Sequence, residues 1–390
     1  MIKNKKIFSF IIFSVFLIWF LIISLNTKCV FADQLNDSIN EQLNNLDLSK
    51  LESFFNSISQ RPDSVDFFWL IKKMLNGETT LDASSFLNYI LNIFLSDVFK
   101  LLPIFICVIA IGVLSSVSQN LRLSNLNESV SETIFFSCNL CVILLLSTQL
   151  IGLYKNIEIV IKNIAILCEI MLPIITTLML SVGGNVSVAV YKPIVAILSG
   201  GIINLTLSVI MPLIIIMTVF NITSSFSPSI KLNKFSDFTS STIKWIIGII
   251  ITVFSIFLSI QGLTSAHYDG ISFKVTKYAI SNSIPIIGGF IKDGFDIVVA
   301  GSVIIKNTIG VALVFALIFL IVSPFLSLLT FSLLLKLTGA LLEPICDSRI
   351  SNFCLSISKT VTYLIVALLS VGLMFFITVI LLIISANAFV

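Results

Sequence analysis

Charged residues are scarce in this sequence. They make up only 11% of the 390 residues, whereas hydrophobic residues make up 57%. A soluble domain carries about 25% charged residues, and no fold with a single interior could hide this much apolar surface from water. The scarcity of charge therefore excludes a soluble globular domain. It predicts an all-α, polytopic membrane protein with about seven or eight spans.

Histidine is almost missing, because His267 is the only one in the chain. A histidine-based metal site is therefore not expected. The sequence also lacks a GxxxxGK[ST] phosphate loop, an HExxH zinc motif and a GxSxG nucleophile elbow. No internal repeat is visible. We accordingly expect no enzymatic activity, no catalytic residue, no cofactor and no metal, and the lack of a basic cluster argues against nucleic-acid binding.

The seven cysteines are scattered and predict no disulfide framework. Cys138 and Cys141 form a C-x-x-C, which can indicate redox chemistry in a soluble βαβ unit. Here the pair sits inside the apolar run 134–153. Small, mildly apolar residues that line a helix are the better interpretation.

The first 100 residues divide into two parts. Residues 1–32 combine three early lysines with an apolar run and a small-residue pattern, and they predict a signal peptide or an N-terminal anchor. Residues 33–100 contain ten acids and five bases, a net charge of 5 − 10 = −5. Apolar residues recur there at helical spacing. We expect a small exported α-helical segment that either caps the protein's own membrane domain or docks an exported partner.

Residues 101–390 are expected to form the multi-span membrane domain. A span needs about 20 mostly apolar residues, and the sequence offers seven clear candidates with residues 284–305 as a disputed eighth. The clear candidates are 101–118, 134–153, 163–183, 194–220, 243–261, 308–335 and 360–384.

The disputed segment carries charge in its middle. On a helical wheel, Gly289, Lys292, Asp293 and Asp296 share one face about 100° wide. Charged groups in a bilayer normally face the bundle interior or a water-filled cavity. The face therefore predicts either a structural ion pair or in-plane helix, or the polar lining of a pathway. Counts of lysine and arginine in the loops mildly favour a full crossing over a re-entrant loop.

Two further acids are candidates for function. Glu169 lies within the apolar run 163–183, where a membrane-embedded acid is a functional candidate. A satisfied structural glutamate is an equally good interpretation. Glu343 follows the apolar run 308–335 and is better explained as a water-facing acid at a helix end.

Three stretches carry a family resemblance. They are "DGISFKVTKYAISNSIPIIGGFIKDGFDIVVAGSVIIKNTIGV" (269–311), "YKPIVAILSGGIINL" (191–205) and "ALLEPICD" (340–347). At these positions, and in its layout, the chain resembles the stage III sporulation protein AE family of endospore-forming bacteria. The resemblance offers no catalytic motif, so no catalytic residue is transferred.

The resemblance implies a membrane subunit of a channel or secretion-like complex that links mother cell and forespore and is required for late forespore gene expression. It implies a multi-pass protein of the mother-cell membrane around the forespore, with residues 33–100 extracytoplasmic. The implied partners are other stage III A sporulation proteins, a forespore-side membrane protein and the lipid bilayer. The alternative is a self-sufficient permease for a small solute, which would use the 292–296 face and Glu169.

Overall fold

The computed structural model describes residues 49–58, 83–122, 128–181, 184–226, 232–283, 287–345 and 348–385. Within them every regular element is a helix. The side chains of residues 279–296 lie outside this description. The elements are α3 (Ser49–Ile58), α5 (Ala83–Arg122), α6 (Glu128–Ser181), α7 (Asn185–Ala196), the π-helical η1 (Ile197–Ile203) and η2 (Thr206–Ile210), α8 (Met211–Phe226), α9 (Asn233–Ser283), α10 (Ile287–Leu342) and α11 (Ser348–Ser385).

Six helical segments within the described residues are long and apolar enough to cross a membrane. They lie in α5, α6, the α7–α8 unit, α9, α10 and α11. The prediction of an all-α, polytopic membrane protein is thereby confirmed. The number of separate long helices is six in this part of the chain, because two pairs of predicted spans are each joined into one helix.

The first joined pair is 134–153 with 163–183, and the second is 284–305 with 308–335. α6 has 54 residues and continues through Lys155, Glu158 and Lys162. α10 has 56 residues and continues through Lys306. At a rise of about 1.5 Å per residue, each helix is roughly 80 Å long, far more than the roughly 30 Å core of a bilayer. These helices therefore extend well beyond the membrane at one or both ends.

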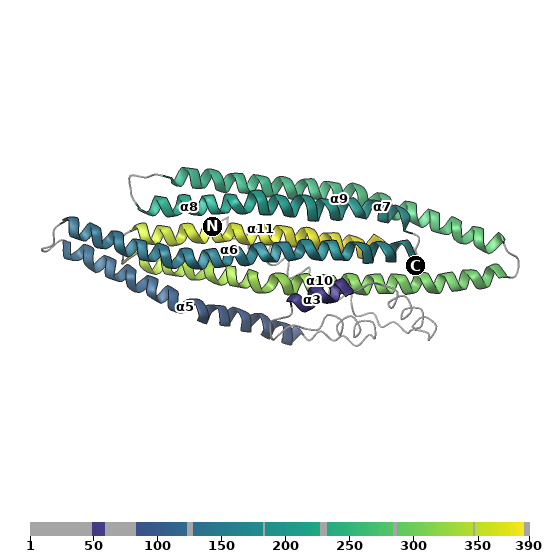
Figure 1. Cartoon of the computed structure of the whole chain (residues 1–390), viewed down its shortest axis with the longest axis horizontal. Helices are drawn as coiled ribbons and strands as arrows, with labels where there is room; N and C mark the ends of the chain where they lie inside the picture. The colour runs from purple at the N-terminus through teal and green to yellow at the C-terminus, as the bar shows by residue number, and fades with distance from the viewer. Residues whose placement is uncertain are drawn as a thin grey trace.

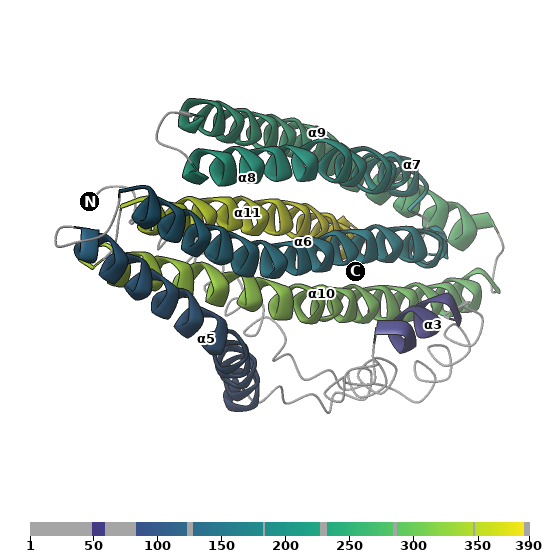
Figure 2. The ribbon, with the colours of Figure 1, turned by 60° about the vertical axis from the view of Figure 1, so that its left-hand side comes forward.

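The helices form an elongated antiparallel bundle with three layers (Figure 1). The α7–α8 unit and α9 make one outer layer, α6 and α11 the middle, and α10 and α5 the other side, as Figure 2 also shows. The end of α5, the end of α8 and the end of α10 lie together at one end of the bundle, with the starts of α6, α9 and α11. We call this the α10–α11 end.

The core of the bundle is the packing of α10 against α11. A methyl group added at Gly339 would lie 3.1 Å from Leu355 Cγ and 3.3 Å from the Ser351 carbonyl oxygen, so the two backbones approach closely there. Ser351 Oγ donates a hydrogen bond to the Gly339 carbonyl over 2.8 Å. Seven residues away along each of the two helices, the hydroxyls of Ser332 and Ser358 are hydrogen-bonded at 2.9 Å. Small residues and short polar side chains are typical of tightly packed membrane helices.

The segment from Asn185 to Phe226 is one continuous helical unit that contains two π-helical stretches in its middle. The π-helical η1 and η2 lie between Pro193 and Pro212. Proline has no N–H to donate, which disturbs the regular ladder of a helix on either side. The predicted 194–220 span therefore exists but is not a regular α-helix throughout.

The boundary expected at residue 100 falls inside a helix. α5 runs without interruption from Ala83 to Arg122 and contains Pro103. Both views show α5 bending away from the bundle towards its start (Figures 1 and 2), as a proline within a helix would cause. The short helix α3, which precedes α5 in the chain, buries the side chains of Leu51 and Phe54 and packs on α6.

Candidate functional site

A polar cavity of about 410 Å³ lies at the α10–α11 end, between α8, α9 and α11. We call it the polar cavity. In a chain with so little charge, it brings together hydroxyls, amides and ionic groups. Its lining includes Asn221, Ser236, Asp237, Arg349, Ser356 and Lys359.

Asn221 is the centre of a buried hydrogen-bond network at the base of this cavity. Its Oδ1 accepts a bond of 2.7 Å from Ser236 Oγ, and its Nδ2 donates over 3.1 Å to Thr360 Oγ1. Asn221 belongs to α8, Ser236 to α9 and Thr360 to α11, and all three are buried. A buried amide that loses its partners costs free energy, so the network fixes the relative positions of three helices.

Two more bonds connect the end of α8 to its neighbours. Asn139 Nδ2 on α6 donates to the Ser225 carbonyl over 2.8 Å. Ser224 Oγ donates to Asn233 Oδ1, at the start of α9, over 2.6 Å. The carbonyl groups in the last turn of a helix have no partner within the helix. Asn139 supplies one for Ser225, so the end of α8 is anchored to α6 and α9.

Two cations near the cavity, Arg349 and Lys244, lie against aromatic rings. The Arg349 guanidinium carbon lies 4.8 Å from the centre of the Phe135 ring, and Lys244 Nζ lies 5.7 Å from that of Tyr363. Both distances are within the range of cation–π attraction. Tyr363 and Arg349 line the cavity together with Lys359 of the same helix, and Asp237 is the one acid among the described residues of the lining.

A second polar site lies near the end of α11, far from the cavity. Lys306 on α10 is fully buried, and its Nζ donates to the Ile383 carbonyl over 3.0 Å. Ile383 lies in the last turn of α11, where carbonyls lack intrahelical partners and the helix dipole favours a cation. Among the described residues no carboxylate pairs with Lys306. Lys306 falls in the short interval between the predicted spans 284–305 and 308–335, and its burial within α10 shows that no exposed loop separates them.

The structure places the predicted candidate residues as follows. Gly289, Lys292, Asp293 and Asp296 all fall on α10, near its start, and their side chains lie outside the described part of the chain. Glu169 is exposed on the outer face of α6, and Glu343 is exposed in the turn after α10. Neither glutamate lines the polar cavity, so these candidates remain predictions.

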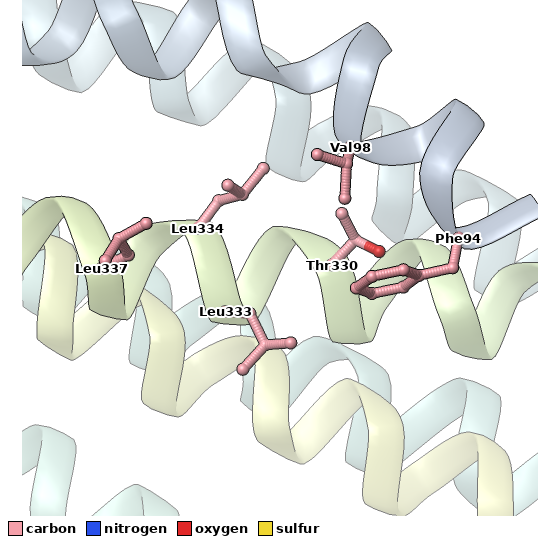
Figure 3. A pocket seen from close by; sticks show the side chains of 6 residues that line it. All are labelled: Phe94, Val98, Thr330, Leu333, Leu334 and Leu337. Atoms are coloured by element: carbon pink, nitrogen blue, oxygen red, sulfur yellow. The ribbon is translucent and has the colours of Figure 1, made fainter. Parts of the chain in front are cut away.

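An apolar groove of about 280 Å³ separates α5 from α10. Figure 3 shows Phe94 and Val98 of α5 facing Thr330 and Leu334 of α10 across it. The Thr330 hydroxyl is buried there without a hydrogen-bond partner. Three residues before Thr330, Ser327 Oγ donates to Asp97 Oδ2 over 2.5 Å. Asp97, which we assigned to the exported segment, thus holds α5 against α10.

Sequence reasoning missed Asn221, Arg349, Lys359 and Lys306 as members of sites. A signal for Lys306 was present, because it shares the 3–4 spacing of the buried face of α10. That face comprises Val299, Val303, Lys306, Gly310, Leu313 and Leu317. The polar cavity left only a weak signal, since its residues come from the polar ends of three separate helices.

Long apolar helices, polar networks that connect them and a buried lysine define this chain as a multi-span helical membrane protein. It belongs to the stage III sporulation protein AE family, whose family model matches residues 65–386. A relative with that name from Bacillus subtilis (strain 168) is 25% identical over 355 residues, covering 88% of this chain and 86% of the relative. The resemblance drawn from three sequence stretches is confirmed. No solved structure matches the chain.

Replacing Asn221 with leucine should destabilise the bundle, because Ser236 and Thr360 would lose a buried partner. We expect a cost of roughly 1–3 kcal/mol, seen as a lower melting temperature of the purified protein in detergent. Asn204→Leu is the control, since Asn204 is exposed and its Nδ2 bonds only the Gly200 carbonyl of its own helix. Equal melting temperatures for the two variants would contradict the role of Asn221.

Proposed function

We propose that this protein is an integral membrane subunit of the channel or secretion-like complex that links mother cell and forespore, and that forespore development and late forespore gene expression require it. Membership of a sporulation family is the observation that carries this proposal. The role we propose is that of a membrane platform and conduit element without enzymatic activity of its own. Its proposed partners are other stage III A proteins and a forespore-side membrane protein.

The dimensions of the bundle support a platform role. On α6, 20 residues separate Phe135, beside Arg349, from Lys155. That interval is about 30 Å, the thickness of one bilayer core. Lys162 pairs with Glu158 over 2.6 Å just beyond it, and both are exposed. The remaining part of α6, from Lys155 to Ser181, then extends about 40 Å past this level and offers a surface for other subunits.

The distribution of bases supports an orientation with the α10–α11 end in the mother-cell cytoplasm. Among the described residues from α5 onward, six lysines and arginines lie near that end and five near the opposite end, with Lys100, Lys155 and Lys162 at intermediate positions. The six are Arg122, Lys234, Lys244, Lys336, Arg349 and Lys359; the five are Lys192, Lys274, Lys277, Lys292 and Lys306. Short cytoplasmic loops carry the excess of positive charge. This orientation agrees with an exported segment preceding α5.

The permease alternative would use the 292–296 face together with Glu169. Glu169 is exposed on the outside of α6. It does not converge with other ionisable side chains in a described cavity. No specific observation favours this second function, and we retain the complex subunit as the proposal.

Affinity capture tests the proposed function. A C-terminally tagged chain, produced in sporulating cells from its own promoter, should recover other stage III A proteins after mild solubilisation. An unrelated multi-span protein with the same tag and promoter is the control and should recover none. Recovery of no stage III A protein by the tagged chain, when the protein itself is intact and abundant, would contradict the proposal.

The orientation can be tested by cysteine labelling in a cysteine-free background. Ile345→Cys lies in the exposed turn after α10, and Ser181→Cys lies at the exposed end of α6. In intact protoplasts of vegetative cells that produce the variants in their surface membrane, a membrane-impermeant maleimide should label Ser181→Cys, and it should label Ile345→Cys only after permeabilisation. The reverse pattern would show that the proposed sidedness is inverted.

A further inference from the structure

The polar cavity interrupts the apolar surface of the bundle at the α10–α11 end. On α6 the predicted span 134–153 begins level with the start of α11, because Phe135 lies against Arg349. On α11 itself the predicted span begins only at residue 360, although the helix starts at Ser348. At a rise of about 1.5 Å per residue, polar side chains therefore extend roughly 16 Å deeper on α11 than on α6. The start of α9, which lies on the other side of the cavity, is similarly polar.

Two lysines lie at the inner limit of this polar stretch. Lys359 on α11 is exposed and lines the cavity. Lys244 on α9 is also exposed, and its Nζ lies 5.7 Å from the ring centre of Tyr363, which lines the cavity too. Each lysine lies roughly 16 Å along its helix from the helix start. Among the described residues neither has a carboxylate within ion-pair distance. Charged groups at such a depth in a bilayer normally face a water-filled cavity.

Uncharged groups and one acid in the lining also require water. Asn352 and Ser356 lie one turn apart on the same face of α11, and Asp237 lines the cavity from α9. Within the described residues their side chains form no hydrogen bond to another protein group. Polar groups without partners are costly in hydrocarbon. A volume of about 410 Å³ holds on the order of ten water molecules, which is enough to hydrate these groups.

The inner end of the cavity is closed by apolar side chains. Met217 on α8 and Tyr363 on α11 are the lining residues of these helices that lie farthest from the α10–α11 end. Just beyond them, Ile214, Ile247 and Leu364 are buried. We call these three residues the floor of the cavity. Hydrophobic constrictions of this kind gate channels by excluding water.

We propose that the polar cavity is a water-filled vestibule, which is open at the α10–α11 end, reaches roughly 20 Å into the bundle and admits small hydrophilic solutes as far as the floor. The opening lies at Asn233 and Ser348, which are exposed residues of the lining at the starts of α9 and α11. The Asn221 network joins α8, α9 and α11 beside the floor, so it holds these helices together and keeps the floor closed.

This inference deepens the proposed function, because a conduit element needs a hydrated entrance, and it rests on that function only for its role in the cell. Water access is a property of the isolated chain. It can therefore be measured separately from the capture of other stage III A proteins, and a failure of either experiment leaves the other result standing.

Thiol labelling of the purified full chain in nanodiscs tests the vestibule, in a cysteine-free background. Ser356→Cys should react with a charged, membrane-impermeant maleimide at least about tenfold faster than Leu333→Cys, because the reactive thiolate forms in water and not in hydrocarbon. Ser332 bonds Ser358, so the two positions lie at nearly the same depth, and position 333 is the more exposed of the two. Leu364→Cys, in the floor, should not react. After denaturation in detergent, all three variants should react fully.

A plug at the opening tests the route by which water enters. Asn352→Trp, one turn nearer the opening than position 356, should slow the labelling of Ser356→Cys and leave that of Leu333→Cys unchanged. Equal labelling rates at positions 356 and 333 would overturn the vestibule, and rapid labelling at position 364 would overturn the closed floor. Unchanged labelling behind the plug would overturn the proposed entrance. If Ser356→Cys fails to fold, Ser240→Cys on the α9 wall of the cavity takes its place.

Discussion

Polar groups inside this bundle must find partners on other helices, because the hydrocarbon core of a membrane offers none. Asn221 meets Ser236 and Thr360, Ser332 meets Ser358, and Tyr191 donates to the Thr378 carbonyl over 3.1 Å. Each bond joins different helices, so each one excludes alternative rotations and shifts of those helices. Apolar packing alone would tolerate many such arrangements, since lipid tails are as apolar as leucine. The positions of α7 to α11 therefore depend on a small number of hydrogen bonds.

The same constraint explains why the two polar sites lie near helix ends. The polar cavity gathers the end of α8 and the starts of α9 and α11, and Lys306 binds a carbonyl in the last turn of α11. Helix ends expose backbone groups that need outside partners and that carry partial charge. Side chains that satisfy these groups stabilise the bundle and create polar surfaces within a membrane protein. For a family that acts in sporulation, such surfaces are the places where specific contacts can be made.

The sequence was sufficient to predict the class of fold and the approximate positions of the apolar segments. It failed where a polar interval was taken to separate two helices. The interval 154–162 contains neither glycine nor proline, and its backbone remains helical in α6 because helical hydrogen bonds do not depend on side-chain polarity. Lys306 was likewise taken to lie between two spans, whereas the backbone of α10 continues as a helix through it. The polar cavity was not predictable, since Asn221, Ser236 and Arg349 come together only when three distant helices pack.

Paired polar groups hold α10 and α11 in one fixed register. Disulfide cross-linking in native membranes measures this register, in a cysteine-free background with Ser332→Cys and Ser358→Cys. These hydroxyls are 2.9 Å apart and buried, so mild oxidation should join the pair rapidly within one chain. Leu333→Cys with Ser358→Cys should not react, because Leu333 is exposed on the outer face of α10. Cross-linking of the 333 pair in place of the 332 pair would show that α10 and α11 pack in a different register.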